Sequence, residues 1–335
     1  MNVLVLTESG AGVGFGHVTR CAAVCQAFQC IGVQPRLVVR GGVAGADWDG
    51  GGGAVAFDWI VQRDSLAGML TSIDVVFVDS YLAAEEVYRE IRSAVPTCVY
   101  FDDDRRLRYP PGYVLNGAIH AEEMDYPELP GVRYLLGREF TVLRKDFWRV
   151  PDKVMREEIE TVLITVGGSD TQGVTSEILG ALRHSPHRFK KHVVVTRHFA
   201  NVAEIERFAD ADTEIIMSPG AAQMKGLMLE ADLAISGCGQ TLYELARVGL
   251  PVCGICMAAN QYQNITGWRK AGFLDYVGRC NESEFEQRLL SAVSGLRSRS
   301  AREVRSQAGR VVLDGRGQER VLSAVLSHMG GHSIE

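Results

Sequence analysis

Short apolar runs alternate with segments of helical periodicity along the first hundred residues, and this alternation restricts the fold more than any other feature. Two helix patterns, "HVTRCAAVCQAFQCIG" and "AAEEVYREIRSAV", lie among these runs, and the first one stops at Gly32, a helix terminator. Strands that alternate with helices predict a parallel sheet with crossover connections. The apolar runs are "NVLVLT", "PRLVVR", "DVVFVD" and "TCVYFD".

The same alternation starts again in the second half of the chain. A polar stretch without an apolar stripe follows Pro151, and it predicts a linker near residues 149–159. A length of 335 residues also suggests two domains. We therefore expect two doubly wound α/β domains, 1–150 and 151–335, whose sheets face a central cleft. The later strand patterns are "TVLITVGG", "HVVVT", "EIIM", "DLAIS" and "PVCGIC".

Composition excludes several function classes. The formal net charge is −6, so nucleic acid is not expected as the main partner. No apolar run reaches the 18 or more residues of a membrane span, and the N-terminus lacks a signal-peptide pattern. We expect a cytoplasmic protein without membrane insertion, and a monomer is compatible with the sequence. The eight cysteines include a lone CxxC at Cys253 and Cys256, which favours reduced structural thiols over a metal site.

The loop after the first strand pattern, "GVGFGHVTRC", raises the question of a phosphate or catalytic site. Its spacing is not that of a dinucleotide fingerprint, and no P-loop GK[ST] is present. Gly14 and Gly16 let a ligand approach the main chain closely. His17 either faces the cleft as a catalytic group or caps and packs the helix. Arg20, one turn further on, either faces the cleft or pairs with an acid.

Two more loops of the first half follow strands, where ligands of open parallel sheets bind. "VDSY" places Ser80 and Tyr81 after Asp79, and "FDDD" ends at Asp104. One of these acids could orient a histidine or hold a sugar hydroxyl. For Asp103 and Asp104 we favour the alternative, in which they begin a turn and cap the next segment.

The second half carries a better anion site. The turn "VGGSD", with Gly168 and Ser169, and the next helix start offer backbone amides to an anion. "SGCGQT" leads into a helix whose free N–H groups at Gly239, Gln240 and Thr241 suit a diphosphate.

Two further positions in this half suit a nucleotide sugar. Glu244 could accept hydrogen bonds from ribose hydroxyls, or it could be a surface glutamate on an amphipathic helix. Asn260 and Gln261 are uncharged polar groups suited to sugar or base contacts.

In these residues the chain resembles the UDP-2,4-diacetamido-2,4,6-trideoxy-β-L-altropyranose hydrolases of pseudaminic acid synthesis. These belong to the GT-B group, which includes the peptidoglycan N-acetylglucosaminyltransferase. The resemblance covers nearly the whole length, because seven motifs occur in the same order. They are "GFGHVTRC", "VDSY", "FDDD", "LLGREFTVLR", "VGGSD", "MKGLMLEADLAISGCGQTLYELARVGLP" and "NQYQN".

The resemblance implies two Rossmann-like domains, with UDP held mainly by the second. It implies that Glu244 binds ribose, that residues 239–241 lie at the diphosphate, and that His17 acts on the attacking water. Tyr81 and Asn260 match family positions near the sugar. Neither a metal nor another cofactor is implied.

Three stretches depart from the family pattern. The segment 236–241 differs from the usual Ser-Ala-Gly-Gly-Ser-Thr, "TQGVT" lacks the asparagine that often follows "GGSD", and the opening segment carries Glu8. These changes touch phosphate and sugar contacts, so they leave the sugar and the base open.

The sequence therefore predicts a metal-independent nucleotide-sugar hydrolase of nonulosonic acid biosynthesis. Water would attack the anomeric carbon with inversion, releasing UDP and a free amino or deoxy sugar. The alternative is a GT-B glycosyltransferase that passes the sugar from a UDP-sugar to a hydroxyl or amine acceptor. A third interpretation, a non-catalytic subunit that binds nucleotide sugars, would not need a histidine at position 17.

Overall fold

The computed structural model describes residues 1–10, 16–41 and 53–329. The chain divides into two compact units, Met1–Trp148 with the segment from Gly315 onward, and Arg149–Asp314. The sequence predicts a second domain that runs to the C-terminus, whereas the structure groups the last segment with the first unit.

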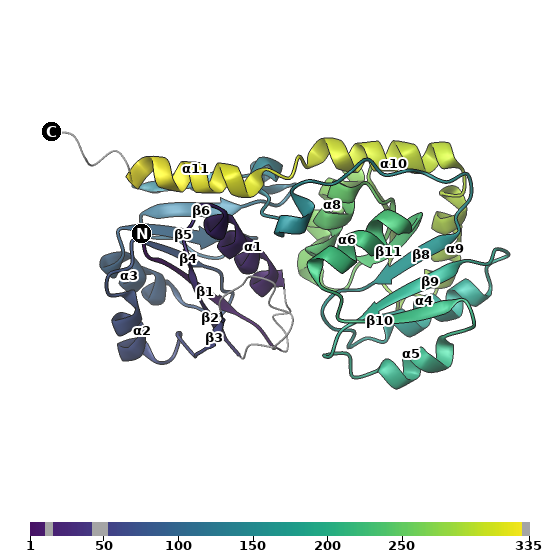
Figure 1. Ribbon diagram of the computed structural model, residues 1–335, viewed down its shortest axis with the longest axis horizontal. Helices are drawn as coiled ribbons and strands as arrows, with labels where there is room; N and C mark the ends of the chain where they lie inside the picture. The colour runs from purple at the N-terminus through teal and green to yellow at the C-terminus, as the bar shows by residue number, and fades with distance from the viewer. Residues whose placement is uncertain (11–15, 42–52, 330–335) are drawn as a thin grey trace. The chain divides into compact units, whose positions relative to one another are not determined.

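The first unit contains a seven-stranded parallel sheet in the order β3-β2-β1-β4-β5-β6-β7 (Figure 1). Strand order reverses between β1 and β4, which is where ligands of such sheets bind. The sheet is apolar on both faces because helices cover both, as in other parallel sheets. Its strands are β1 Val3–Glu8, β2 Arg36–Arg40, β3 Val55–Ala56, β4 Val75–Val78, β5 Thr97–Phe101, β6 Gly112–Asn116 and β7 Val132–Leu136.

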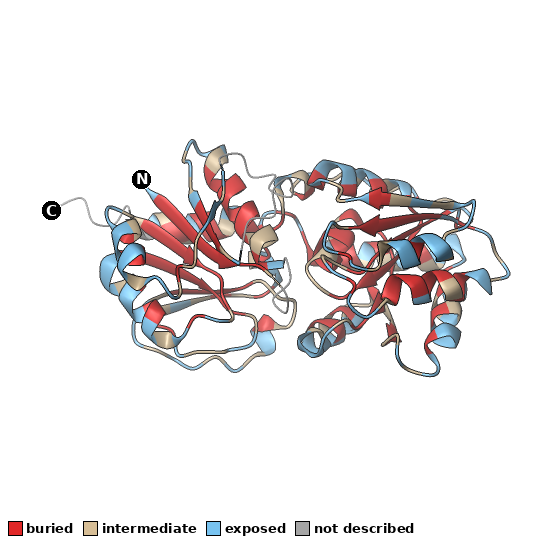
Figure 2. Cartoon of the chain, turned by 90° about the horizontal axis from the view of Figure 1, so that it is seen from below, coloured by how far each residue is buried: buried red, intermediate tan, exposed pale blue. Residues whose placement is uncertain are grey.

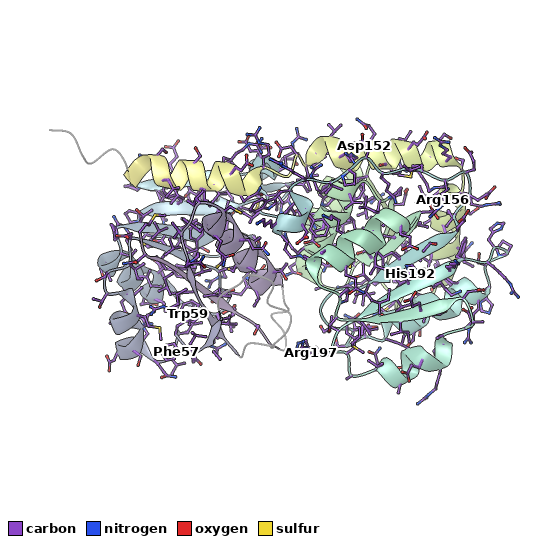
Figure 3. The ribbon with its side chains drawn as sticks, viewed as in Figure 1. Phe57, Trp59, Asp152, Arg156, His192 and Arg197 are labelled. Carbon is purple, nitrogen blue, oxygen red and sulfur yellow. The ribbon has the colours of Figure 1, made fainter. Side chains whose placement is uncertain are left out.

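Two apolar clusters bury the two faces of this sheet, and its central strands are buried throughout (Figure 2). Trp59, labelled in Figure 3, is fully buried in one cluster, and its indole Nε1 donates a hydrogen bond to the Thr7 carbonyl (2.8 Å). The helices are α1 Gly16–Cys30, α2 Arg63–Leu70, α3 Glu85–Ala94 and α11 Gly317–Met329. Short 3₁₀ helices are η2 Ala121–Glu123, η3 Arg138–Phe140 and η4 Lys145–Phe147.

Helix α11 belongs to the first unit because its apolar face completes that core. Val321 and Val325 are fully buried in the same cluster as residues of α1. The Tyr113 hydroxyl donates to the Ala324 carbonyl (2.9 Å). Gly317 allows the close approach, since a Cβ there would lie 2.0 Å from the Thr141 carbonyl oxygen.

The second unit contains a six-stranded parallel sheet in the order β10-β9-β8-β11-β12-β13, with the reversal between β8 and β11. Its strands are β8 Thr161–Thr165, β9 Lys190–Val195, β10 Thr213–Met217, β11 Leu233–Gly237, β12 Val252–Ile255 and β13 Leu274–Gly278. The helices are α4 Val174–Arg183, α5 Val202–Phe208, α6 Ala221–Glu230, α7 Thr241–Val248, η5 Ala259–Gln261, α8 Tyr262–Lys270, α9 Phe285–Gly295 and α10 Arg299–Val312.

Helix α7 ends at a glycine. Gly249 adopts the left-handed conformation (φ +81°), and its N–H bonds to the carbonyls of Leu245 and Ala246. A Cβ at this position would also lie 2.5 Å from Ser306 Oγ, so glycine is required by both conformation and packing against α10.

The expected alternation of strands and helices is confirmed in both units, and Gly32 follows α1 with a φ of +79°. Strands β3, β6, β7 and β13 were not expected. Strand β3 has two exposed residues, and β7 at the sheet edge mixes exposed and buried positions, so neither shows a continuous apolar run.

Candidate functional site

The first candidate site lies at the carboxyl ends of three neighbouring strands, β1, β4 and β5. Glu8 ends β1, Asp79 follows β4, and Asp103 follows β5. Helix α1 begins at Gly16, directly after the loop that leaves β1. Gly14 lies outside the described residues. This arrangement brings side chains from α1 against the ends of β4 and β5.

His17 and Asp79 form a buried pair. The ring Nδ1 lies 2.5 Å from Asp79 Oδ1, and His17 is 4 % exposed. Because the Asp79 carboxylate is ionised, Nδ1 carries the proton and donates it, which leaves Nε2 as the basic nitrogen. No hydrogen bond joins Nε2 to any residue in the described part of the chain. The pair is arranged as in enzymes where a carboxylate orients a histidine base.

Arg20 pairs with two carboxylates. Its guanidinium donates to Asp79 Oδ2 (2.5 Å) and Oδ1 (2.7 Å), and to Asp103 Oδ1 (2.7 Å). It also lies over the Phe101 ring, 4.8 Å from the centroid. Of the two interpretations left open by the sequence, pairing with acids is therefore the one that the structure bears out.

Charge fixes the protonation states of this network. Burial by itself would raise the pKa of Asp79, but the Arg20 charge, followed by His17, overrides burial and holds that pKa well below its usual range. Burial likewise opposes ionisation of Asp103, and Arg20 again lowers its pKa. Burial would lower the pKa of Arg20, but Asp103 and then Asp79 raise it well above its ordinary value. Two carboxylates and one guanidinium leave one net negative charge beside His17.

Tyr81 joins this network from the loop after β4. Its hydroxyl donates to Asp103 Oδ2 (2.6 Å), and its ring meets the His17 ring edge-on at 4.4 Å between centroids. Burial, followed by Asp103, raises the pKa of Tyr81, so the phenol stays protonated. The sequence singled out Tyr81, but its partner Asp103 was expected only to begin a turn.

Glu8, at the end of β1, binds the loop after β4 through two hydrogen bonds. Its fully buried carboxylate accepts hydrogen bonds from Ser80 Oγ (2.5 Å) and from the Tyr81 backbone N–H (2.6 Å). Glu8, one of the positions where the sequence departs from the family pattern, therefore positions Tyr81. The sequence offered one signal for this role, a charged residue at the end of an otherwise apolar strand.

The turn-forming role expected for Asp103 and Asp104 was wrong for Asp103, because Arg20 and Tyr81 occupy both of its carboxylate oxygens. Asp102 takes that role instead: it is buried and accepts the Arg106 backbone N–H (3.1 Å). Asp104 is exposed. The sequence could not separate these three acids, because only their different directions after β5 distinguish them.

The second candidate site lies at the carboxyl ends of β8, β11 and β12, which are also neighbours. Gly167 has a φ of +117°, and the Gly168 carbonyl accepts a hydrogen bond from Thr196 Oγ1 (2.7 Å). Ser169 is exposed. The buried Asp170 accepts the N–H groups of Val174 and Thr175 at the start of α4.

Glycines bring the β11 loop close to its neighbours. A Cβ at Gly237 would lie 2.6 Å from the Val166 carbonyl oxygen, so only glycine fits between β11 and the end of β8. A Cβ at Gly239 would lie 3.6 Å from Gln261 Nε2, which places this glycine beside the β12 loop. Gln240 and Thr241 follow, and Thr241 begins α7.

The β12 loop is held by hydrogen bonds to its own backbone and to a neighbouring helix. Gln261 Oε1 accepts the Met257 N–H (2.9 Å), while Asn260 is exposed. Asn264 Nδ2 donates to the Cys238 carbonyl (2.8 Å), and Tyr243 donates to Asn264 Oδ1 (2.5 Å). Asn264 thus ties α8 to the β11 loop, a role that the sequence did not predict although it lies in "NQYQN".

Glu244 lies in the first turn of α7 and is 2 % exposed. This burial excludes the interpretation of Glu244 as a surface glutamate on an amphipathic helix. The second site therefore differs from the first in composition: glycines, amides and the two buried carboxylates of Asp170 and Glu244 take the place of a network of ion pairs.

Three further observations concern metals, cysteines and membranes. The described residues contain no group of three or more His, Cys, Asp or Glu side chains arranged to hold a metal ion. All eight cysteines are unpaired, and both Cys253 and Cys256 are buried. No helix within the described ranges is long and apolar enough to cross a membrane.

Comparisons with known proteins relate the chain to nucleotide-sugar proteins. No protein-family profile matches it. A Helicobacter pylori protein named pseudaminic acid cytidylyltransferase and UDP-2,4-diacetamido-2,4,6-trideoxy-β-L-altropyranose hydrolase is 24 % identical over 275 residues, which cover 78 % of this chain and 45 % of that protein. The spore coat polysaccharide biosynthesis protein SpsG of Bacillus subtilis is 23 % identical over 205 residues, 59 % of each chain. The chain thus spans about half the length of these curated relatives.

Solved structures show the fold. MurG of Acinetobacter baumannii superposes with a TM-score of 0.63 at 14 % identity, covering 98 % of this chain and 100 % of that one. MnaA of S. aureus, solved with UDP, gives a TM-score of 0.64 at 11 % identity, covering 98 % and 97 %. The chain has the GT-B fold. This confirms the fold class that the sequence predicts.

Proposed function

We propose that the chain hydrolyses a nucleotide sugar, releasing UDP and a free amino or deoxy sugar. The observation that carries the proposal is the His17–Asp79 pair, which leaves Nε2 free to act on water. The name of the H. pylori relative includes hydrolysis of a UDP-linked diacetamido sugar, and that of the B. subtilis relative refers to polysaccharide biosynthesis. The name of the H. pylori relative supports a role in nonulosonic acid biosynthesis.

In the proposed reaction, water attacks the anomeric carbon from the face opposite the nucleotide. The bond between that carbon and the phosphate oxygen breaks, and its electron pair leaves with UDP, so the product anomer is inverted. The proton of the attacking water passes to His17 Nε2. Asp79 stabilises the imidazolium that results, because its depressed pKa keeps it ionised throughout.

The second unit would hold the nucleotide. The backbone N–H groups of residues 239–241, at the start of α7, suit the diphosphate and its developing negative charge. Glu244 would accept hydrogen bonds from the ribose hydroxyls. Gly168 and Ser169 would line the same nucleotide site from the end of β8.

The sugar-binding roles are proposed for each unit by itself. In the first unit Tyr81 would lie beside a sugar, and Gly16 would leave room for the sugar and water. In the second unit Asn260 and Gln261 would bind polar groups of a sugar. Arg20 is better described as a positioning residue, because its guanidinium is engaged by Asp79 and Asp103. It would hold both carboxylates in place for His17 and Tyr81.

A GT-B glycosyltransferase is the second candidate, and the solved structures of similar fold include the calicheamicin glycosyltransferase CalG4, at 12 % identity. In that case His17 would remove a proton from an acceptor hydroxyl or amine instead of from water. The other residues at both sites would keep their roles.

NMR of a panel of UDP-sugars, incubated with the protein and no acceptor, tests the proposal. We expect one sugar of the panel to be released free, with UDP and with the opposite anomeric configuration. Release that occurs only after a hydroxyl or amine acceptor is added would replace hydrolysis with transfer. A retained anomer would contradict the single displacement by water.

A further inference from the structure

A cavity of about 500 Å³ opens in the first unit, and none of the residues that pair with His17 lines it. It lies among the loop after β5, the segment after η2, and β7. Nothing in the proposed hydrolysis uses it. Three arginines and three tyrosines line it: Arg105, Arg106, Arg108, Tyr109, Tyr126 and Tyr134.

The tyrosine rings that line the cavity pack against other tyrosine rings. Tyr109 is stacked on Tyr100 with centroids 5.3 Å apart and an interplanar angle of 13°. The Tyr126 and Tyr134 rings lie 5.1 Å apart. Both hydroxyls of this second pair bond to the protein: Tyr126 donates to the Asp102 carbonyl (3.3 Å) and Tyr134 to that of Pro127 (2.6 Å). These two residues therefore offer mainly ring surface to a ligand, which suits the C–H face of a sugar.

The arginines supply unused positive charge. Arg106 is anchored, since its Nη2 donates to the Ser80 (3.1 Å) and Ala83 (2.8 Å) carbonyls. Arg108, in contrast, is exposed and has no hydrogen bond or ion pair with any described residue. A guanidinium without a partner at the wall of a cavity is suited to bidentate binding of a phosphate or carboxylate.

Arg105 adds a strained backbone at the same wall. Its φ is +57°, a left-handed conformation that is unfavourable for a long side chain, and its guanidinium donates to the Asp125 carbonyl across the cavity. Arginines outnumber acids at this wall. Two acids line the cavity, and one of them, Glu85, is already paired with Arg89 (2.5 Å), which leaves Asp125 beside the three arginines.

We propose that this cavity is a second ligand site, which binds a small anion carried on a sugar ring, such as a phosphorylated sugar. The arginines would bind the charged group, and the tyrosine rings would pack against the sugar. The site would be independent of the nucleotide site in the second unit and of turnover at His17.

Isothermal titration of the whole chain with glucose 1-phosphate, glucose and inorganic phosphate tests this site. UDP at saturating concentration is added in every arm to occupy the nucleotide site. We expect glucose 1-phosphate to bind, and glucose and phosphate each to bind at least about tenfold more weakly, since each lacks one half of the recognition. Equal affinities for glucose and glucose 1-phosphate, or no binding of glucose 1-phosphate at millimolar concentration, would overturn the proposal.

Two variants assign the binding to the cavity. Arg108→Ser should weaken glucose 1-phosphate binding about tenfold or more, whereas Arg138→Ser, an exposed arginine of the same unit outside the cavity, should leave it unchanged. Arg105→Gly should weaken binding while the melting temperature is kept, because glycine relieves the left-handed backbone. Equal binding by Arg108→Ser and Arg138→Ser would show that the anion binds elsewhere. None of these results depends on whether UDP-sugars are hydrolysed.

Discussion

The two candidate sites occupy the same place in two similar sheets, yet their residues differ in kind. In the first unit, His17, Arg20, Asp79, Tyr81 and Asp103 form one charged network at the ends of β1, β4 and β5. In the second unit, glycines and amides dominate at the ends of β8, β11 and β12. The contrast suggests a division of labour, because a charged network can move protons and exposed helix N–H groups can hold a diphosphate.

The largest expected effect breaks the network of the first unit. Arg20→Gln leaves the buried Asp79 and the half-buried Asp103 without their cation, and removal of one partner of a buried ion pair costs about 3–5 kcal/mol. We expect the free energy of unfolding in urea to fall by about that amount. Arg138→Gln, an exposed arginine of the same unit, is the matched control and should stay within about 0.5 kcal/mol of wild type.

The same network predicts a dependence of stability on pH. The folded-state pKa values of Asp79 and Asp103 are lowered, so their contribution to stability is complete above the ordinary carboxyl pKa of about 4. It is lost as pH falls from there through the folded pKa values. Arg20→Gln should therefore lose less stability on acidification than wild type does. An identical loss in both proteins would contradict the assignment of these pKa shifts to Arg20.

The next prediction tests whether Asp79 orients the His17 base or binds the substrate. Asp79→Asn removes the charge that stabilises the imidazolium, and we expect kcat to fall on the order of 100-fold with KM little changed. Asp104→Asn, at the exposed acid of the β5 loop, is the control and should keep normal kcat. A rise in KM alone, without loss of kcat, would assign Asp79 to substrate binding instead.

The smallest effect concerns the second unit. Glu244→Ala removes the acceptor proposed for ribose hydroxyls, and UDP affinity measured by calorimetry should fall about tenfold, as for one charge-assisted hydrogen bond. Glu204→Ala, an exposed glutamate in the first turn of α5, is the control. Unchanged UDP affinity in Glu244→Ala would contradict the role proposed for Glu244 in binding the nucleotide.

The sequence predicts the strand–helix alternation because buried parallel strands are continuous apolar runs, as β1 and β4 are. It also identifies the loops that carry the sites, since those loops follow strands. It could not predict that Asp103 pairs with Arg20, because residues 83 positions apart are brought together only by the sheet. For the same reason, no local sequence pattern predicts the hydrogen bond from the Tyr81 N–H to the Glu8 carboxylate.

The return of α11 to the first unit was likewise hidden from the sequence. Its apolar residues Val321, Leu322 and Val325 predict a buried face, but the same pattern would suit either core. Gly317 lets the chain pass close to Thr141, but nothing in the sequence around it predicts this contact. Packing of distant segments, and not local propensity, decides such assignments.

Turnover of the best UDP-sugar by His17→Ala, followed by NMR beside wild type, tests the central claim most directly. We predict that release of free sugar slows about 100-fold or more, while UDP binding to the second unit is retained. Arg20 and Asp79 should still pair in this variant, so the first unit should remain folded. Sugar release at nearly the wild-type rate would contradict the account, because the base would then have to be another group.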